Sequence, residues 1–185
     1  MLFKKSSADE IREVIGSLLI TTQGVEHLIN QCLRLVIRFR QATTIDEIYA
    51  LKEPEKKKTL GELLGELRKR VSVEPSFDSL LKSFLKNRNT FAHTMSFLPG
   101  WTLETDAGRR VAIEFLGRYS TELAQVQKIF VAFAREEDTR LGRNTPIPQG
   151  GQKFFAMIDK QYLPLVVGLV APNLREQKKT RSKKD

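Results

Sequence analysis

The chain has 185 residues, of which 41% are hydrophobic and 29% charged, with 11 glycines and 7 prolines. This balance is typical of a globular protein, and the length suits one domain with a sizeable core better than two. The single cysteine, Cys32, excludes an internal disulfide, and its place in an apolar helical pattern predicts a small core residue in a reducing compartment.

The sequence pattern predicts neither a signal peptide nor a membrane-spanning segment. The N-terminus MLFKKSSADEIREV is too charged to lead into a signal-peptide core, and the apolar stretch LPLVVGLVAP is too short to cross a bilayer. We therefore expect a cytoplasmic protein with no membrane partner.

The net charge of +9 is unevenly distributed. The segment REQKKTRSKKD at the C-terminus holds six Lys/Arg and two Asp/Glu, which supplies +4 and leaves +5 for the rest. A modest excess of this kind most often serves solubility and is weak evidence for a polyanionic partner. Residues 174–185 lack apolar periodicity and are predicted to be a disordered basic tail, with or without a partner.

The first predicted element is a long amphipathic helix over residues 8–38. Its apolar seam repeats every seven positions, at Ile11, Leu18, Val25 and Cys32, and Thr22 interrupts the intermediate row. His27 lies on this helix and is expected to be a surface or boundary residue, so we assign it no role.

Two further helices are predicted before residue 95. Residues 41–58 are interpreted as a connector, after which Thr59 and Glu62 form the T-x-x-E pattern of a capping box at the start of a second helix. Pro75 and Ser76 then mark the start of a third helix, whose apolar residues at helical spacing continue into KNRNTFAHTM, residues 86–95. Phe91 and Ala92 are expected to lie in its buried face.

The remainder of the chain is also predicted to be helical. A loop over residues 97–108 precedes a long fourth helix marked by apolar residues from 111 to 133, and RNTPIPQGGQ reads as a linker. Beyond it, KFFAMIDKQYLPLVVGLV predicts one or two short helices. No alternating β pattern is present. We predict an all-α four-helix bundle in a single domain over residues 1–173, with a core of about 8–136 and a C-terminal helical extension of about 150–172.

The usual signatures of metal, nucleotide or acyl-transfer chemistry are absent from the sequence. There are two histidines and no C-x-x-C, H-E-x-x-H, Gly-rich phosphate loop or G-x-S-x-G. No metal or cofactor is therefore predicted.

Arg88, Asn89 and His93 stand out because they fall in a helix that should otherwise be buried. A charged side chain on a packed face must meet a carboxylate, a carbonyl cluster, a ligand phosphate or water in a cleft. One interpretation is structural: Arg88 pairs with a glutamate of another helix and His93 merely caps or packs. The other is a phosphate-binding and proton-transfer site.

The arrangement R-N-T-F-A-H resembles the R-x4-6-H signature of the HEPN superfamily, in the form Arg, polar residue, three residues, His. The wider match, over about residues 8–133, adds the long first helix, a TLGELLGEL helix and the LLKSFLKNRNTFAH helix that carries the motif. The resemblance implies a HEPN-like four-helix bundle and metal-independent endoribonuclease activity, with two protomers sharing one cleft. Arg88, Asn89 and His93 are the implied catalytic residues.

These residue types suit that chemistry. Neutral His93 could accept the proton of an RNA 2′-hydroxyl, which then attacks the adjacent phosphate. Arg88 could hold the phosphate with its planar fork of donors, and Asn89 could orient His93 or donate to a phosphate oxygen.

An ideal helix nevertheless separates the two main groups. Arg88 and His93 are five positions apart, which is about 140° around an α-helix, whereas Asn89 is only about 40° from His93. Convergence requires a distorted helix, a long reach by Arg88 or a second protomer. A homodimer would also supply a second His93 as the acid for the leaving group, so we expect the first helix and the motif helix to line a dimer interface.

The resemblance also bears on biological context. Some HEPN toxins paired with nucleotidyltransferase antitoxins carry a tyrosine two residues after the motif histidine, where this chain has Met95. That subtype is disfavoured, although a toxin or defence role with an antitoxin or regulatory partner is still implied. The alternatives are a non-catalytic helical module that binds RNA or protein, and a purely structural dimerisation domain.

Overall fold

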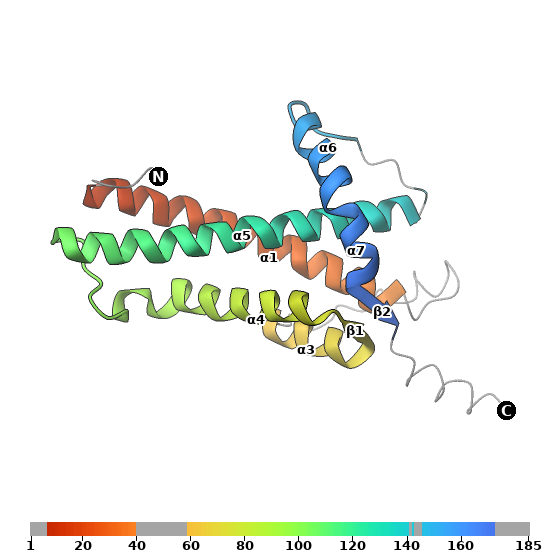
Figure 1. Cartoon of the computed structure of the whole chain (residues 1–185), viewed down its shortest axis with the longest axis horizontal. Helices are drawn as coiled ribbons and strands as arrows, with labels where there is room; N and C mark the ends of the chain where they lie inside the picture. Colours follow the sequence, from red (N-terminus) through yellow and green to blue (C-terminus); the bar gives the residue numbers. More distant parts are fainter. Residues whose placement is uncertain (1–6, 40–58, 141, 143–145, 173–185) are drawn as a thin grey trace. The chain divides into compact units, whose positions relative to one another are not determined.

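A computed structural model of the chain describes residues 7–39, 59–140, 142 and 146–172. Most of them lie in helices: α1 (Ala8–Phe39), α3 (Leu60–Arg70), α4 (Pro75–Asn89), α5 (Asp106–Arg140), α6 (Gln152–Gln161) and α7 (Leu163–Leu169) (Figure 1). The all-α prediction is confirmed, including the two short helices near the C-terminus. The finer assignment to a HEPN-like four-helix bundle stays a prediction, and the expected connector at 41–58 and tail at 174–185 lie outside the described residues.

One feature differs from the sequence-based expectation. Two three-residue strands, β1 (Val71–Val73) and β2 (Val170–Pro172), pair antiparallel with Ser72 opposite Ala171. Segments this short cannot display a period of two in the sequence, and their pairing depends on residues that are almost 100 positions apart.

Local sequence explains where the helices begin. The Thr59 amide donates to Glu62 Oε2 at 2.6 Å and the Glu62 amide donates to Thr59 Oγ1 at 3.3 Å, so the predicted capping box is confirmed. Ser7 and Glu10 form a second capping box at the start of α1, with corresponding distances of 2.7 and 3.2 Å. Helix α4 begins at Pro75, as predicted, where the missing N–H of proline costs nothing.

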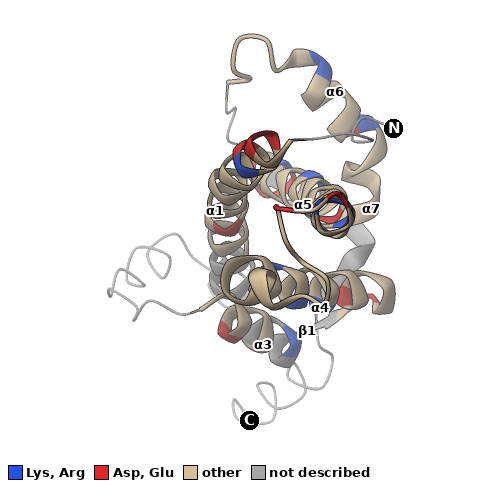
Figure 2. Ribbon diagram, turned by 90° about the vertical axis from the view of Figure 1, so that its left-hand side faces the viewer, with Lys and Arg blue, Asp and Glu red and all other residues tan. Residues whose placement is uncertain are grey.

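The chain divides into two compact units, the first made of residues 1–27 and 79–127 and the second of residues 28–78 and 128–185. In the first unit, segments of α1, α4 and α5 run side by side (Figures 1 and 2). Their apolar faces form its core, which contains Ile11, Leu18, Val25, Leu81, Phe84, Phe91, Ala112, Phe115, Leu116, Tyr119, Leu123 and Val126. Whether residues 1–173 act as a single domain stays a prediction.

The second unit has its own core, built around aromatic rings. Phe77 lies 6.1 Å from Phe130 and 5.9 Å from Phe133, measured between ring centroids. Cys32 is buried beside them and its thiol donates to the carbonyl oxygen of Phe130 at 3.4 Å, as expected for a core residue. Buried positions of the predicted seam, from Ile11 through Leu18 and Val25 to Cys32, therefore serve both units.

The loop between α4 and α5 is held against the first unit. Gly100 has a φ of +76°, which favours glycine, and reverses the chain after Pro99. Trp101 then packs edge-on against Phe115, with ring centroids 6.4 Å apart. Gly108, in the first turn of α5, lies so close to the backbone of Thr102 that a β-carbon would be 2.4 Å from the Thr102 carbonyl oxygen.

Candidate functional site

The motif lies where helix α4 changes its hydrogen-bonding pattern. Helix α4 ends at Asn89, a π-helical turn, η1, covers Thr90–Thr94, and a 3₁₀ turn, η2, covers Met95–Phe97. A π-helix bonds residue i to residue i+5 instead of i+4, and such turns occur frequently at functional sites. The five-residue spacing from Arg88 to His93 therefore spans a distorted helix, and the separation of an ideal α-helix does not apply to it.

Aromatic packing anchors this turn. Phe91 is 5% exposed, and its ring stacks on Tyr119 of α5 with centroids 4.8 Å apart. Phe84, two turns earlier on α4, stacks on the same tyrosine at 6.4 Å. The buried position predicted for Phe91 is confirmed, whereas the one predicted for Ala92 is wrong, because Ala92 is exposed. The wider π turn shifts the phase of the buried face after Thr90.

Arg88 forms an ion pair that joins two helices of the first unit. Its Nε donates to Oε1 of Glu26 on α1, and the two side chains are 26% and 20% exposed. Its Nη1 also donates to Oδ1 of Asn89, at 3.0 Å. The contact with Glu26 is the one expected from the structural interpretation of Arg88, although the guanidinium is not fully buried.

His93 lies in the π turn with an exposed side chain. No hydrogen bond or ion pair connects it to another residue in the described part of the chain. Arg88 and Asn89 are thus joined by a hydrogen bond. Neither of them bonds to His93, so Asn89 contacts Arg88 and not the imidazole that it was suggested to orient. An exposed imidazole without a partner among the described residues is accessible to a ligand.

Several polar residues without a predicted functional role lie beside the motif. Asn87 Nδ2 donates to Glu122 Oε2 of α5 at 2.9 Å, and Tyr119 shares a 2.8 Å hydrogen bond with Thr22 of α1. Asn87 thus ties α4 to α5, the pair of Arg88 and Glu26 ties α4 to α1, and Tyr119 and Thr22 tie α5 to α1. The sequence contained part of this information, because Thr22 and Glu26 are two polar residues one helical turn apart beside an apolar seam. Their partners could not be identified, because they lie 97 and 62 residues away in the chain.

The electrostatics of this cluster centre on the buried phenol of Tyr119. Burial raises the pKa of Tyr119, and the nearby carboxylates of Glu26 and Glu122 raise it further. The hydrogen bond that Tyr119 shares with Thr22 and the charge of Arg88 act in the opposite direction and lower the pKa. The phenol therefore remains protonated and serves as a hydrogen-bond donor inside the helix contact.

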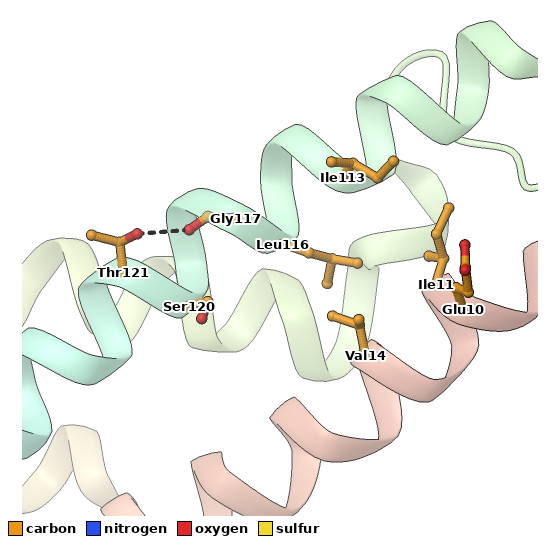
Figure 3. A pocket seen from close by; sticks show the side chains of 8 residues that line it. All are labelled: Glu10, Ile11, Val14, Ile113, Leu116, Gly117, Ser120 and Thr121. Carbon is orange, nitrogen blue, oxygen red and sulfur yellow. Dashed lines mark hydrogen bonds between the residues drawn. The ribbon is translucent and has the colours of Figure 1, made fainter. Parts of the chain in front are cut away.

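A separate pocket of about 300 Å³ lies between α1 and α5 of the first unit. Figure 3 shows Ile11, Val14, Ile113 and Leu116 around its apolar part and Ser120 and Thr121 at the other end. Thr121 Oγ1 already donates to the carbonyl oxygen of Gly117, at 3.0 Å. No residue of the motif lines this pocket, so the two features are independent.

The described residues contain no group of three or more His, Cys, Asp or Glu side chains placed to hold a metal ion. Among the same residues, none of the helices combines the length and the apolar character needed to cross a membrane.

No known protein was found to be similar to this chain. No family model matches it, and no match was found among curated proteins or among solved structures.

Proposed function

We propose that this protein is a metal-independent endoribonuclease of the HEPN type, which acts in the cytoplasm and cleaves RNA by attack of a 2′-hydroxyl. The observation that carries the proposal is the π turn between Arg88 and His93, which replaces α-helical geometry at the motif and leaves the imidazole exposed. A guanidinium in the last turn of α4 and an exposed imidazole in the π turn that follows it are two of the groups that this reaction needs.

The chemistry follows from these groups. His93 removes the proton of the 2′-hydroxyl, and the resulting oxygen attacks the adjacent phosphorus while the bond to the 5′-oxygen breaks. The products are a 2′,3′-cyclic phosphate and a 5′-hydroxyl, which receives a proton from an acid. Arg88 stabilises the negative charge that develops on the phosphate oxygens.

The acid in this scheme comes from a second copy of the chain. The motif of one chain contains one histidine, His93, which already serves as the base. A two-fold axis would place a second His93 in the same cleft, where it could serve as the acid. Exposed apolar side chains support an interface on the predicted elements: Leu19 and Ile20 on α1 are 44% and 72% exposed, and Phe97, just after the motif, is 81% exposed. The family resemblance further suggests a toxin or defence role with an antitoxin or regulatory protein as partner.

A second candidate function is favoured by the ion pair of Arg88. Because the carboxylate of Glu26 already neutralises this guanidinium, the motif could serve to join α1 and α4 in a non-catalytic module that binds RNA or protein. In that case His93 would contact a ligand or solvent without transferring a proton.

RNA cleavage in the presence of EDTA separates the two functions. The purified wild-type chain, His93→Ala and Arg88→Ala would be incubated with single-stranded RNA, with Arg118→Ala as the matched control because Arg118 is an exposed arginine of α5. We expect metal-independent cleavage by the wild type and the control, and loss of cleavage in both motif variants at equal helical content. Binding without cleavage would favour the non-catalytic module, and cleavage that survives His93→Ala would show that the motif does not carry the reaction.

Sedimentation tests the composite site directly. We expect a dimer at micromolar concentration, with Ile20→Glu shifting the chain towards a monomer and reducing cleavage. A wild-type monomer that cleaves RNA at that concentration would rule out the shared site.

A further inference from the structure

The donors of Arg88 are used unequally. A guanidinium has five N–H groups, and here Nε donates to Glu26 while Nη1 donates to Asn89. Nη2 makes no hydrogen bond to any residue in the described segments. We propose that Glu26 is a positioning residue, which grips Arg88 at Nε and thereby presents the two Nη nitrogens to a phosphate. This inference depends on the proposed function, because it assigns the phosphate to the same Arg88.

The surroundings of Glu26 suit a fixed grip. It follows Val25, which is 1% exposed in the core, and lies one helical turn after the buried Thr22. Its charge and that of Arg88 both affect the pKa of the Tyr119 phenol, so the pair lies next to a buried, hydrogen-bonded tyrosine. Water screens a pair in this position less than it screens one on an open surface.

The place of the contact argues against simple competition between Glu26 and the phosphate. A carboxylate that blocked the site would bind Arg88 through the paired Nη1 and Nη2 donors, which are the fork that matches a phosphate. Glu26 uses Nε instead, and Asn89 takes one Nη1 proton from within the same helix. This arrangement fixes the plane of the guanidinium and leaves most Nη protons for a ligand.

The test compares Glu26→Gln and Glu26→Ala with Asn87→Ala as the matched control. Asn87 makes the other contact of this part of α4 with a neighbouring helix, to Glu122 at 2.9 Å, and has no bond to Arg88. We expect Glu26→Ala to lower kcat for single-stranded RNA by about 10- to 100-fold, as a misplaced catalytic group does. Glu26→Gln keeps an oxygen acceptor for Nε and should restore most of kcat, while Asn87→Ala should leave it unchanged at a similar loss of stability.

A second readout does not depend on cleavage. A 2′-O-methyl RNA has no nucleophilic hydroxyl, and its binding can be followed by fluorescence anisotropy. We expect Glu26→Ala to bind it about tenfold more weakly than the wild type, and Glu26→Gln to bind it at least as tightly. If charge alone mattered, both variants would bind more tightly, and that result would overturn the inference.

The outcomes distinguish this inference from the proposed function. If the wild type binds 2′-O-methyl RNA but cleaves no RNA, the ribonuclease proposal fails, while weaker binding by Glu26→Ala would still support the grip on Arg88. If the wild type cleaves RNA and Glu26→Ala is as active as Asn87→Ala, or more active than the wild type, the ribonuclease proposal stands and the positioning role is overturned.

Discussion

The hydroxyl oxygens of Tyr119 and Thr22 lie 2.8 Å apart in the core of the first unit, within hydrogen-bonding distance. Thr22 Oγ1 donates its single proton to the carbonyl oxygen of Leu18, one turn earlier on α1, at 2.7 Å. The Tyr119 phenol must therefore donate to Thr22. The one polar interruption of the apolar seam of α1 is thus the acceptor for a buried tyrosine of α5.

This direction predicts unequal costs for removing the two partners. Tyr119→Phe leaves Thr22 bonded to Leu18 and should reduce the free energy of unfolding by about 1 kcal/mol. Thr22→Val leaves a buried phenol without an acceptor and should cost more, about 1–3 kcal/mol. Urea unfolding of the two single variants and of the double variant measures these free energies. The double variant should lose less free energy of unfolding than the sum of the two single losses. Equal costs that add in the double variant would contradict the assigned direction.

Two glycines of α5 should respond to alanine with opposite signs. A β-carbon at Gly108 would lie 2.4 Å from the carbonyl oxygen of Thr102, so Gly108→Ala must displace the loop and should destabilise the chain by about 1–3 kcal/mol. At Gly117 no described atom lies within 4 Å of that position, and Gly117→Ala should stabilise the helix by about 0.5–1 kcal/mol. Thermal unfolding of the two variants checks both signs. A stable Gly108→Ala chain with unchanged Trp101 fluorescence would show that the loop does not pack as described.

The thiol of Cys32 should make stability depend on alkaline pH. Burial raises the pKa of Cys32 to about 12, and the carboxylates of Glu137 and Asp138 add to the effect. Above about pH 8.5, the ordinary thiol pKa, the unfolded chain releases this proton while the folded chain keeps it. The folded state then binds more protons, so stability falls as pH rises, by up to about 1.4 kcal/mol per pH unit until about pH 12.

Comparison with Cys32→Ala isolates this effect from other groups that titrate at high pH. Urea unfolding between pH 8 and pH 10.5 should show a steeper loss of stability for the wild type than for the variant. Parallel curves for the two chains would mean that the thiol is accessible to water in the folded state.

Arg135 should hold helix α6 in the second unit. Its Nε and Nη2 donate to the two carboxylate oxygens of Asp159, the latter at 2.8 Å, and its guanidinium lies 5.3 Å from the ring centroid of Phe155. Both members of the ion pair are partly exposed, so solvent screening limits the pair to about 1 kcal/mol. Arg135→Ala should therefore speed amide hydrogen exchange in α6 about fivefold.

The matched control is Arg118→Ala, which removes an ion pair with Glu114 that is 71% exposed on both sides. Exchange in α6 should not change in this variant. Equal exchange rates in α6 for Arg135→Ala and Arg118→Ala would contradict a docking role for Arg135.

Periodicity and capping in the sequence were sufficient to predict the helices. The seam of α1, the capping box at Thr59 and the start of α4 at Pro75 all depend on residues within a few positions of one another, and all three predictions are confirmed. The paired strands could not be predicted, because pairing between residues 71–73 and 170–172 leaves no local pattern.

The candidate site was predictable only in part. Residue types and spacing identified Arg88, Asn89 and His93. The geometry of an ideal helix showed that Arg88 and His93 converge only with a distorted helix, a long reach by Arg88 or a second protomer, and did not choose among these three. The partner of Arg88 could not be predicted, because choosing Glu26 from all the acidic residues requires knowing how α1 and α4 pack. The exposure of Ala92 could not be predicted either, because the π turn changes which residues of this segment face the core.

By itself, the sequence determined that this chain is helical and which stretches form most of its helices, since hydrogen bonds and apolar spacing within a helix are local. It also determined which side chains could bind phosphate and transfer a proton. Tertiary structure alone decided that Arg88 is held by Glu26, that Tyr119 donates to Thr22 and that His93 stays exposed. These relationships join residues far apart in the chain, and only the packing of helices fixes their distances.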